Sequence, residues 1–190
     1  NFLPVNDKNT VIKAIHVMKE TYNLTENFAC NLVKHIPTQA GLAGGSADAA
    51  AAIRMIVKLC HLDLSREELI EVGKKVGADV PFCIFNEPAY VNGIGEELEP
   101  FKINTDFNIL LVKPRRGVST SAAFSRLDLE KAVHPDCLKM RKALETDDYL
   151  TVLENLGNSL EKISCKLVPE IREIKKDLSY FGFDGVLMSG

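Results

Sequence analysis

The sequence predicts a mixed α and β fold in two layers, and three stretches lead to this prediction. Apolar residues recur at three- and four-residue steps over residues 9–22, as is typical of an amphipathic helix. A glycine-rich turn over residues 37–46 leads into an alanine run, which indicates a loop that opens a helix. Residues 107–113 are largely apolar and predict a buried strand.

Composition narrows the class of protein. The chain has 190 residues, of which 46% are hydrophobic, so a sizeable core is expected. The formal net charge is −3, so the chain lacks the excess of basic residues that favours binding to nucleic acid or to an anionic membrane. No apolar run approaches the roughly 18 residues of a membrane span. The five cysteines are scattered without C-x-x-C spacing, which favours reduced thiols in a cytoplasmic protein and predicts no protein-built metal site.

The first predicted helix covers residues 9–22. Asp7 or Asn9 is placed to cap its start, and Asn23 follows its end. Residues 27–36 predict a strand with Phe28, Cys30 and Leu32 on one face. His35, near the end of this strand, is interpreted as an ordinary strand-end residue.

The glycine-rich turn is the main candidate for a binding site. Gly41, Gly44 and Gly45 tolerate positive φ, and Ser46 is predicted as the N-cap of the helix behind it. Such a turn presents free N–H groups and the positive end of a helix dipole, which suits phosphate. It matches neither a Walker A loop nor a dinucleotide fingerprint. A tight turn with small residues for close packing remains an equal alternative. Asp48 is predicted in the first helical turn, where the dipole suffices to explain it.

Further helices and a hairpin follow in order. Ser65 and Glu68 form a capping box for a helix that reaches Val76, with Gly77 at its C-cap. Asp79 lies among apolar residues, where spacing favours a helix cap over a functional group. Residues 89–92 and 97–100 predict a hairpin, and residues 102–106 predict a linker. Residues 117–120 predict a turn that leads into a helix over 124–127. Ser119 and Thr120 in this turn are interpreted as capping residues. Helices over 147–156 and 169–178 and a strand over 184–188 complete the prediction.

The glycine-rich turn also resembles the second signature motif of the GHMP kinases, whose corresponding loop wraps the phosphates of ATP. Within that family the resemblance is strongest to the branch that acts on a cytidyl-diphosphate derivative of methylerythritol in the non-mevalonate isoprenoid pathway. Residues 3–14, 77–83, 93–96, 113–120 and 188–190 agree with that branch, in the same order along the chain. The stretch that carries the resemblance reads Pro37-x-x-x-Gly41-Leu42-Ala43-Gly44-Gly45-Ser46.

The resemblance implies an α+β fold in two domains. Residues 1–104 would form a partial N-terminal domain with a mixed sheet and the ATP loop, similar to a ribosomal protein domain. Residues 105–190 would form a partial C-terminal domain, a ferredoxin-like α/β sandwich. The family's lysine-bearing first motif is expected upstream of this sequence. Its glycine-rich third motif is expected to start at residues 188–190 and continue beyond them.

The activity implied by the resemblance is ATP-dependent phosphorylation of the 2-hydroxyl of the small-molecule substrate, with ATP and Mg²⁺ as cofactors. Asp79 falls at the position of the family's catalytic aspartate. The resemblance therefore favours a catalytic role for Asp79 over the helix cap that its spacing favours. Thr120 and Phe124 would lie near the cytidine end of the substrate, and Asn9 near adenine. The ATP-binding residues implied by the resemblance are Pro37, Thr38, Gln39, Ala40, Gly41, Leu42, Ala43, Gly44, Gly45, Ser46, Ala47 and Asn9.

Two positions depart from the commonest form of the motif. Ala43 stands where glycine is usual, and Ala47 stands where serine is usual. Because backbone amides do most of the holding in such loops, function is expected to survive both changes. Two alternatives stay open: another small-molecule GHMP kinase of mevalonate or homoserine type, and a non-catalytic sensor with the same fold.

Overall fold

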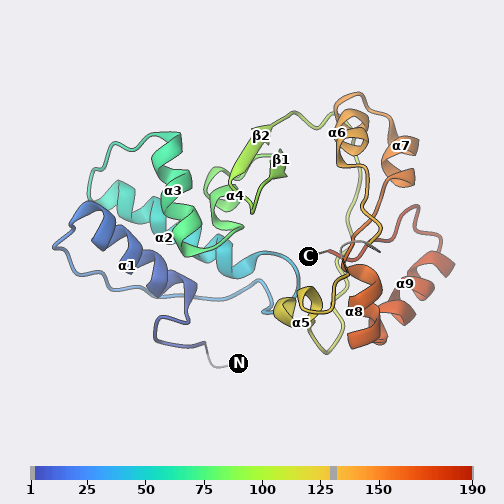
Figure 1. The fold of residues 1–190 in the computed structure, drawn as a ribbon, viewed down its shortest axis with the longest axis horizontal. Coiled ribbons are helices and arrows are strands. Elements are labelled where there is room, and N and C mark those ends of the chain that lie inside the picture. Colours follow the sequence, from blue (N-terminus) through green and yellow to red (C-terminus); the bar gives the residue numbers. More distant parts are fainter. Residues whose placement is uncertain (1–2, 129–131, 190) are drawn as a thin grey trace. The chain divides into compact units, whose positions relative to one another are not determined.

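The computed structural model describes residues 3–128 and 132–189, which form two compact units (Figure 1). The first unit contains the residues up to 37 together with 43–100. The second contains residues 38–42 together with those from 101 onward. The chain enters the second unit at residue 101. Shortly after this point the Asn104 amide donates to the Leu144 carbonyl at 2.9 Å, which attaches the segment to that unit. The domain boundary after residue 104 stays a prediction.

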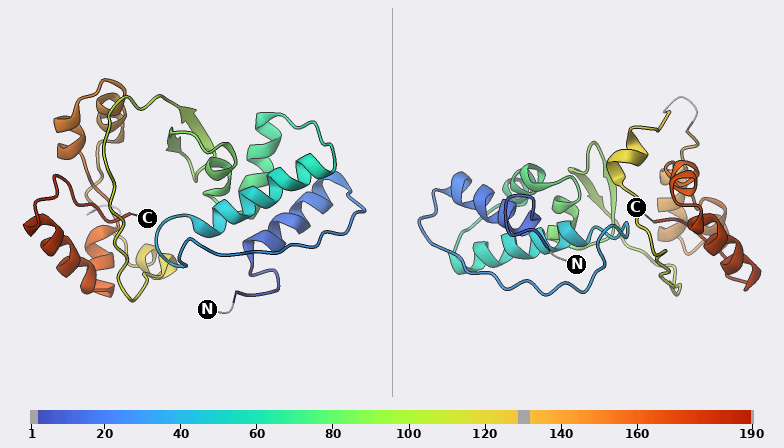
Figure 2. Two further views of the ribbon diagram at one scale, coloured as in Figure 1. Left: turned by 180° about the vertical axis from the view of Figure 1, so that it is seen from behind. Right: turned by 90° about the horizontal axis from the view of Figure 1, so that it is seen from below.

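From residue 3 onward, where the description begins, the first unit contains four helices and one hairpin (Figures 1 and 2). Helix α1 packs on α2 and α3, while α4 packs on α2 and α3. The core between them is apolar, with Met18, Ile53, Val72 and Val80 fully buried. The elements are α1 (Thr10–Tyr22), α2 (Gly44–Leu59), α3 (Arg66–Val76), α4 (Val80–Phe85), β1 (Ala89–Asn92) and β2 (Glu97–Pro100).

Side-chain caps fix the helix boundaries that the sequence predicted. The Asn9 carboxamide accepts from the Val11 amide at 3.0 Å, and Asn23 ends α1 in the left-handed region at φ 52°. The predicted capping box of α3 is present, since the Ser65 hydroxyl accepts from the Glu68 amide and the Glu68 carboxylate accepts from the Ser65 amide. Both helices therefore start where their capping residues satisfy the first free amides.

The predicted hairpin is confirmed. Strands β1 and β2 pair antiparallel, in a register that sets Ala89 opposite Pro100 and Asn92 opposite Glu97. Residues 93–96 connect them, with positive φ at Gly93 and Gly95. The connection thus uses glycines where the backbone needs conformations that other residues rarely adopt.

The second unit contains five short helices in its described part. A small core joins α8 and α9 through Cys165, Val168 and Ile171, with Val118 and Met188 packed against it. The helices predicted over 147–156 and 169–178 are confirmed with shifted ends, whereas α6 and α8 were not predicted. The elements are α5 (Thr120–Phe124), α6 (Cys137–Glu145), α7 (Tyr149–Glu154), α8 (Glu161–Leu167) and α9 (Glu170–Tyr180).

The predictions of strands over three segments are wrong, because these segments do not pair into a sheet in the described structure. In the described residues, the segments 27–36, 107–113 and 184–188 join no ladder. The first still alternates as a strand would: Phe28 and Leu32 pack against the core, although Cys30 is exposed. A strand is defined by a hydrogen-bonded neighbour, and β1 and β2 pair only with each other in the described part. The class nevertheless remains α+β, as predicted.

Across the described residues, every helix is too short or too polar to cross a bilayer.

Candidate active site

The amino end of α2 forms the centre of the predicted phosphate site. Helix α2 begins at Gly44, so the prediction of Ser46 as its N-cap is wrong; Ser46 is the third helical residue. The cause lies in the turn before it, where Gly41 (φ 68°) and Ala43 (φ 47°) are left-handed and bring the chain into the helix early. The two glycines that follow are helical, so among the three predicted glycines only Gly41 uses positive φ.

The first amides of α2 are left without helical partners. No side chain among residues 3–128 and 132–189 caps this end, and the Ala47 amide already donates to the Ala43 carbonyl at 2.8 Å. The amides of Gly44, Gly45 and Ser46 precede that bond and lie at the positive end of the helix dipole. This arrangement suits an anion, although the amide of Ala47 is engaged within the helix.

Contacts from two other segments hold these amides in place. A Cβ on Gly44 would lie 2.7 Å from the Ile36 Cγ2 atom, so a side chain larger than hydrogen does not fit there. Lys34 Nζ donates to the Gly44 carbonyl at 2.8 Å, and the Thr10 hydroxyl donates to the Gly45 carbonyl at 2.7 Å. Because each carbonyl is fixed, the orientation of the following amide is fixed with it.

Sequence reasoning missed Lys34, which contacts the amino end of α2. Its ammonium also forms an ion pair with Asp48, and the two side chains are only 16% and 20% exposed. Asp48 lies beyond the first turn of α2, so its predicted place in that turn is wrong. The period-two alternation of residues 28–36 was the available signal, because it places Lys34 on the same face as Leu32 and Ile36.

Residues 38–42 of the predicted loop pack within the second unit. A Cβ on Gly117 would lie 2.6 Å from the Gln39 Cβ and 2.8 Å from the Gln39 carbonyl oxygen. The Ser189 hydroxyl donates to the Gly41 carbonyl at 2.9 Å. Three stretches that the resemblance singled out, far apart in sequence, therefore meet in this unit.

Asp79 occupies the turn between α3 and α4. It stands at the N-cap position of α4, yet its side chain makes no capping hydrogen bond in the described structure. Its carboxylate is exposed. The pKa of the nearby Cys83 thiol is raised, mainly by burial and then by the Asp79 charge, while Arg54 acts in the opposite direction. Within the described residues this exposed carboxylate makes no capping bond, which leaves it accessible to a substrate group.

The other predicted site residues outside the loop lie at the starts of α1 and α5 or on the exposed surface of α5. The Ser119 hydroxyl accepts from the Ala122 amide at 3.3 Å, so Ser119 caps α5 as interpreted. Thr120 is the first residue of that helix, and the Phe124 ring is 58% exposed. Asn9 caps α1, and its side-chain amide also donates to the Pro4 carbonyl at 2.9 Å.

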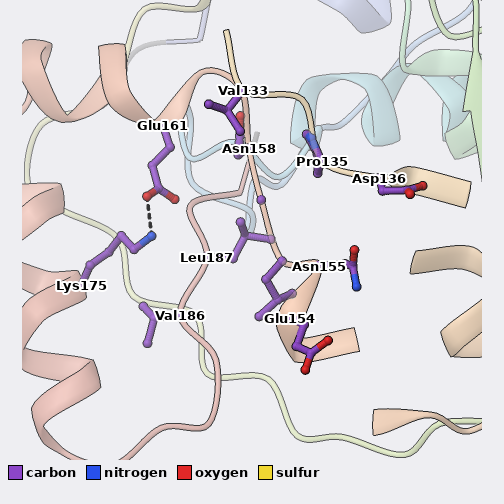
Figure 3. Close-up of a pocket in the computed structure, with 12 residues that line it drawn as sticks. Val133, Pro135, Asp136, Glu154, Asn155, Asn158, Glu161, Lys175, Val186 and Leu187 are labelled. Carbon is purple, nitrogen blue, oxygen red and sulfur yellow. Dashed lines mark hydrogen bonds and ion pairs between the residues drawn. The ribbon is translucent and has the colours of Figure 1, made fainter. Parts of the chain in front are cut away.

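A separate cavity of about 360 Å³ lies within the second unit (Figure 3). Its lining includes Asn155, Asn158 and Leu187 and a closed ion pair between Lys175 and Glu161. None of the predicted site residues lines it. In the described part of the chain, no group of three or more His, Cys, Asp or Glu residues is arranged to hold a metal ion.

Comparison with known proteins now defines the class. The model of the GHMP kinases N terminal domain matches residues 9–87, which contain the amino end of α2 and the Asp79 turn. A protein named 4-diphosphocytidyl-2-C-methyl-D-erythritol kinase from Geobacillus thermodenitrificans is 42% identical over all of this chain and 65% of its own length. Its counterpart from Enterococcus faecalis is 41% identical over all of this chain and 67% of its own length.

A solved structure agrees with these relatives. The crystal structure of a 4-(cytidine 5'-diphospho)-2C-methyl-D-erythritol kinase superposes with a TM-score of 0.73 and 26% identity, over all of this chain and 68% of the other. The fold is thus that of a GHMP kinase. More narrowly, the chain belongs to the 4-diphosphocytidyl-2-C-methyl-D-erythritol kinase family. It spans about two thirds of the length of these relatives.

Proposed function

We propose that the complete protein transfers the terminal phosphoryl group of ATP to the 2-hydroxyl of 4-diphosphocytidyl-2-C-methyl-D-erythritol. The observation that carries the proposal is the uncapped amino end of α2, where the amides of Gly44, Gly45 and Ser46 have no helical partner. The names of the relatives supply the acceptor. Phosphoryl transfer asks the protein for positioning and charge stabilisation more than for covalent chemistry, and such amides provide both.

The proposed ATP contacts extend over residues 37–47. Lys34 and Thr10 keep the α2 amides directed at the phosphates by fixing the carbonyls of Gly44 and Gly45. The Ser46 hydroxyl is proposed to contact a phosphate or its Mg²⁺, an ion that binds phosphate oxygens with few protein ligands. Asn9 is also proposed to lie near adenine. Because its side chain is occupied as the cap of α1, this proposal concerns its position and not a hydrogen bond from its carboxamide.

Asp79 is proposed to accept or orient the proton of the acceptor hydroxyl. This role needs an ionisable group that can approach the hydroxyl to within hydrogen-bonding distance. An exposed carboxylate without a capping bond meets the requirement. Thr120 and Phe124 are proposed at the cytidine end, where the exposed Phe124 ring offers an apolar face to a pyrimidine.

We also propose that the protein works in the cytoplasm. All five cysteines are free thiols in the structure, as expected where the cellular thiol pool keeps them reduced.

The proposal is tested by ADP release from the complete protein with ATP, Mg²⁺ and each candidate alcohol. We expect turnover with 4-diphosphocytidyl-2-C-methyl-D-erythritol and none with mevalonate or homoserine. Asp79→Asn should keep ATP binding and lower kcat by about 10²- to 10⁴-fold, the usual contribution of a general base. Turnover of mevalonate or homoserine would contradict the substrate. ATP binding without turnover of any alcohol would indicate a sensor instead.

A further inference from the structure

The tip of the β1–β2 hairpin is in contact with the turn that carries Asp79. Gly95 has φ 119°, and a Cβ built on it would lie 2.3 Å from the Ala78 carbonyl oxygen and 2.9 Å from the Ala78 carbonyl carbon. Carbon and oxygen atoms in van der Waals contact are separated by well over 3 Å. The backbone immediately before Asp79 therefore occupies the space that any side chain at residue 95 would need.

A second glycine supports the same turn from α3. A Cβ on Gly73 would lie 3.0 Å from the Pro81 nitrogen, so the start of α4 rests directly on the α3 backbone. The turn is closed by the Val80 amide, which donates to the Gly77 carbonyl at 3.1 Å. The backbone around Asp79 is thus confined between α3 on one side and the hairpin tip on the other.

The hairpin tip is itself tied together. The Glu96 carboxylate accepts from the Ile94 amide at 2.7 Å, and the Gly95 amide donates to the Asn92 carbonyl at 3.2 Å. A tip held by these bonds resists displacement. It can therefore fix the position of the Ala78 carbonyl that lies against it.

We infer that the hairpin tip positions the Asp79 carboxylate for catalysis, with Gly95 as the positioning residue. The inference rests on the proposed function, because it assigns Gly95 a role that acts through Asp79. Asp79 makes no capping hydrogen bond in the described part of the chain, whereas the backbone on either side of it is fixed by the Gly95–Ala78 contact and the Val80–Gly77 bond. A displacement of about 1 Å at a reacting group lowers the rate roughly 100-fold.

The first test compares Gly95→Ala with Gly93→Ala in the complete protein. Both glycines have positive φ, but a Cβ on Gly93 meets only the flexible Glu96 side chain. We expect Gly95→Ala to lower kcat about 100-fold with an unchanged KM for ATP, and Gly93→Ala to keep the parental kcat. Equal kcat values for the two variants would overturn the inference.

The second test combines each change with Asp79→Asn. If Gly95 acts through Asp79, Gly95→Ala should cause no further loss once Asp79→Asn is present. A full additional loss would mean that Gly95 acts elsewhere and would overturn the inference. Parental activity in Asp79→Asn alone would instead refute the base assignment of the proposed function, so the two failures are distinguishable.

A third measurement does not depend on activity. The Asp79 charge helps raise the pKa of the Cys83 thiol, so the pH midpoint of Cys83 alkylation, followed by peptide mass spectrometry, reports where that charge lies. We expect the midpoint to change in Gly95→Ala and to stay constant in Gly93→Ala; a constant midpoint in both would overturn the inference. If Gly95→Ala does not fold, Ala78→Gly, which loosens the backbone that Gly95 contacts and leaves the Glu96 side chain untouched, replaces it in all three measurements with the same expectations.

Discussion

At the scale of single residues, Lys34 links the strand-like segment to the proposed phosphate site. It neutralises Asp48 and holds the Gly44 carbonyl at the same time. Without it, Asp48 would be an unpaired and largely buried carboxylate on the helix that is proposed to receive phosphate. An unpaired buried charge is costly, and its field opposes a second negative charge nearby.

We therefore predict that Lys34→Met raises the KM for ATP on the order of tenfold, because the repulsion from Asp48 is no longer compensated. Initial-rate measurements on the complete protein check this. The double variant Lys34→Met/Asp48→Asn serves as the control and should recover most of the affinity. No recovery in the double variant would show that the Gly44 contact, and not the charge, is what matters.

Glu96 provides a prediction about pH. Backbone hydrogen bonds from its own amide and from Ile94 lower the pKa of its carboxyl group, below the ordinary value of about 4.3. A depressed pKa means that the ionised group contributes stability above the unfolded-state pKa, and that this contribution is lost as pH falls through the folded-state pKa. Carbon-detected NMR titration of the folded protein should give a lower midpoint than the same carboxyl in urea. Equal midpoints would contradict the hydrogen bonds.

At the scale of elements, the start of α2 contains a conformational conflict. Ala43 adopts φ 47° at the N-cap position, a region that L-residues with a Cβ disfavour by about 1 kcal/mol or more. Glycine enters this region freely. The turn is therefore less stable with alanine than it would be with glycine.

Accordingly, Ala43→Gly is predicted to raise the free energy of unfolding by up to about 1 kcal/mol, because the relief of roughly 1–2 kcal/mol of left-handed strain exceeds the roughly 0.5–1 kcal/mol that glycine costs through the freer unfolded chain. Urea denaturation measures this difference. Ala40→Gly is the matched control, since Ala40 lies in the same loop without positive φ. There, glycine only adds freedom to the unfolded chain and should destabilise by about 0.5–1 kcal/mol. Destabilisation of similar size by both changes would refute the left-handed assignment at Ala43.

At the scale of the whole molecule, each compact unit has its own apolar core. Met18 is fully buried in the first, and Ile171 is 7% exposed in the second. Met18→Ala should lower the free energy of unfolding by about 2–5 kcal/mol and weaken hydrogen-exchange protection in α1–α3. Ile171→Ala should weaken protection in α8 and α9 instead. Loss of protection in the same helices for both variants would contradict separate cores.

The sequence predicted best those elements whose boundary signals are local. Helices α1 and α3 have side-chain caps, and the hairpin has glycines in its turn. Helix α8 lacks such a signal, because Leu160 at its N-cap makes no side-chain bond. Predicted strands depended on distant partners, which local pattern does not supply. At the candidate site, Asp79 and the glycine loop were proposed from the resemblance and stay predictions, whereas the Lys34–Asp48 pair and the Gly95 contact depend on tertiary packing.

The apolar stretch over residues 107–112 bears on how the protein could self-associate. In the described structure their backbone joins no ladder, and Ile109 and Leu111 are 71% and 64% exposed. Open main-chain donors and acceptors beside apolar side chains are a template onto which another polypeptide can add a strand. Self-association in concentrated solution would then begin at this stretch. Asp106 and Lys113, which flank it, would oppose in-register stacking of identical copies because like charges would face each other.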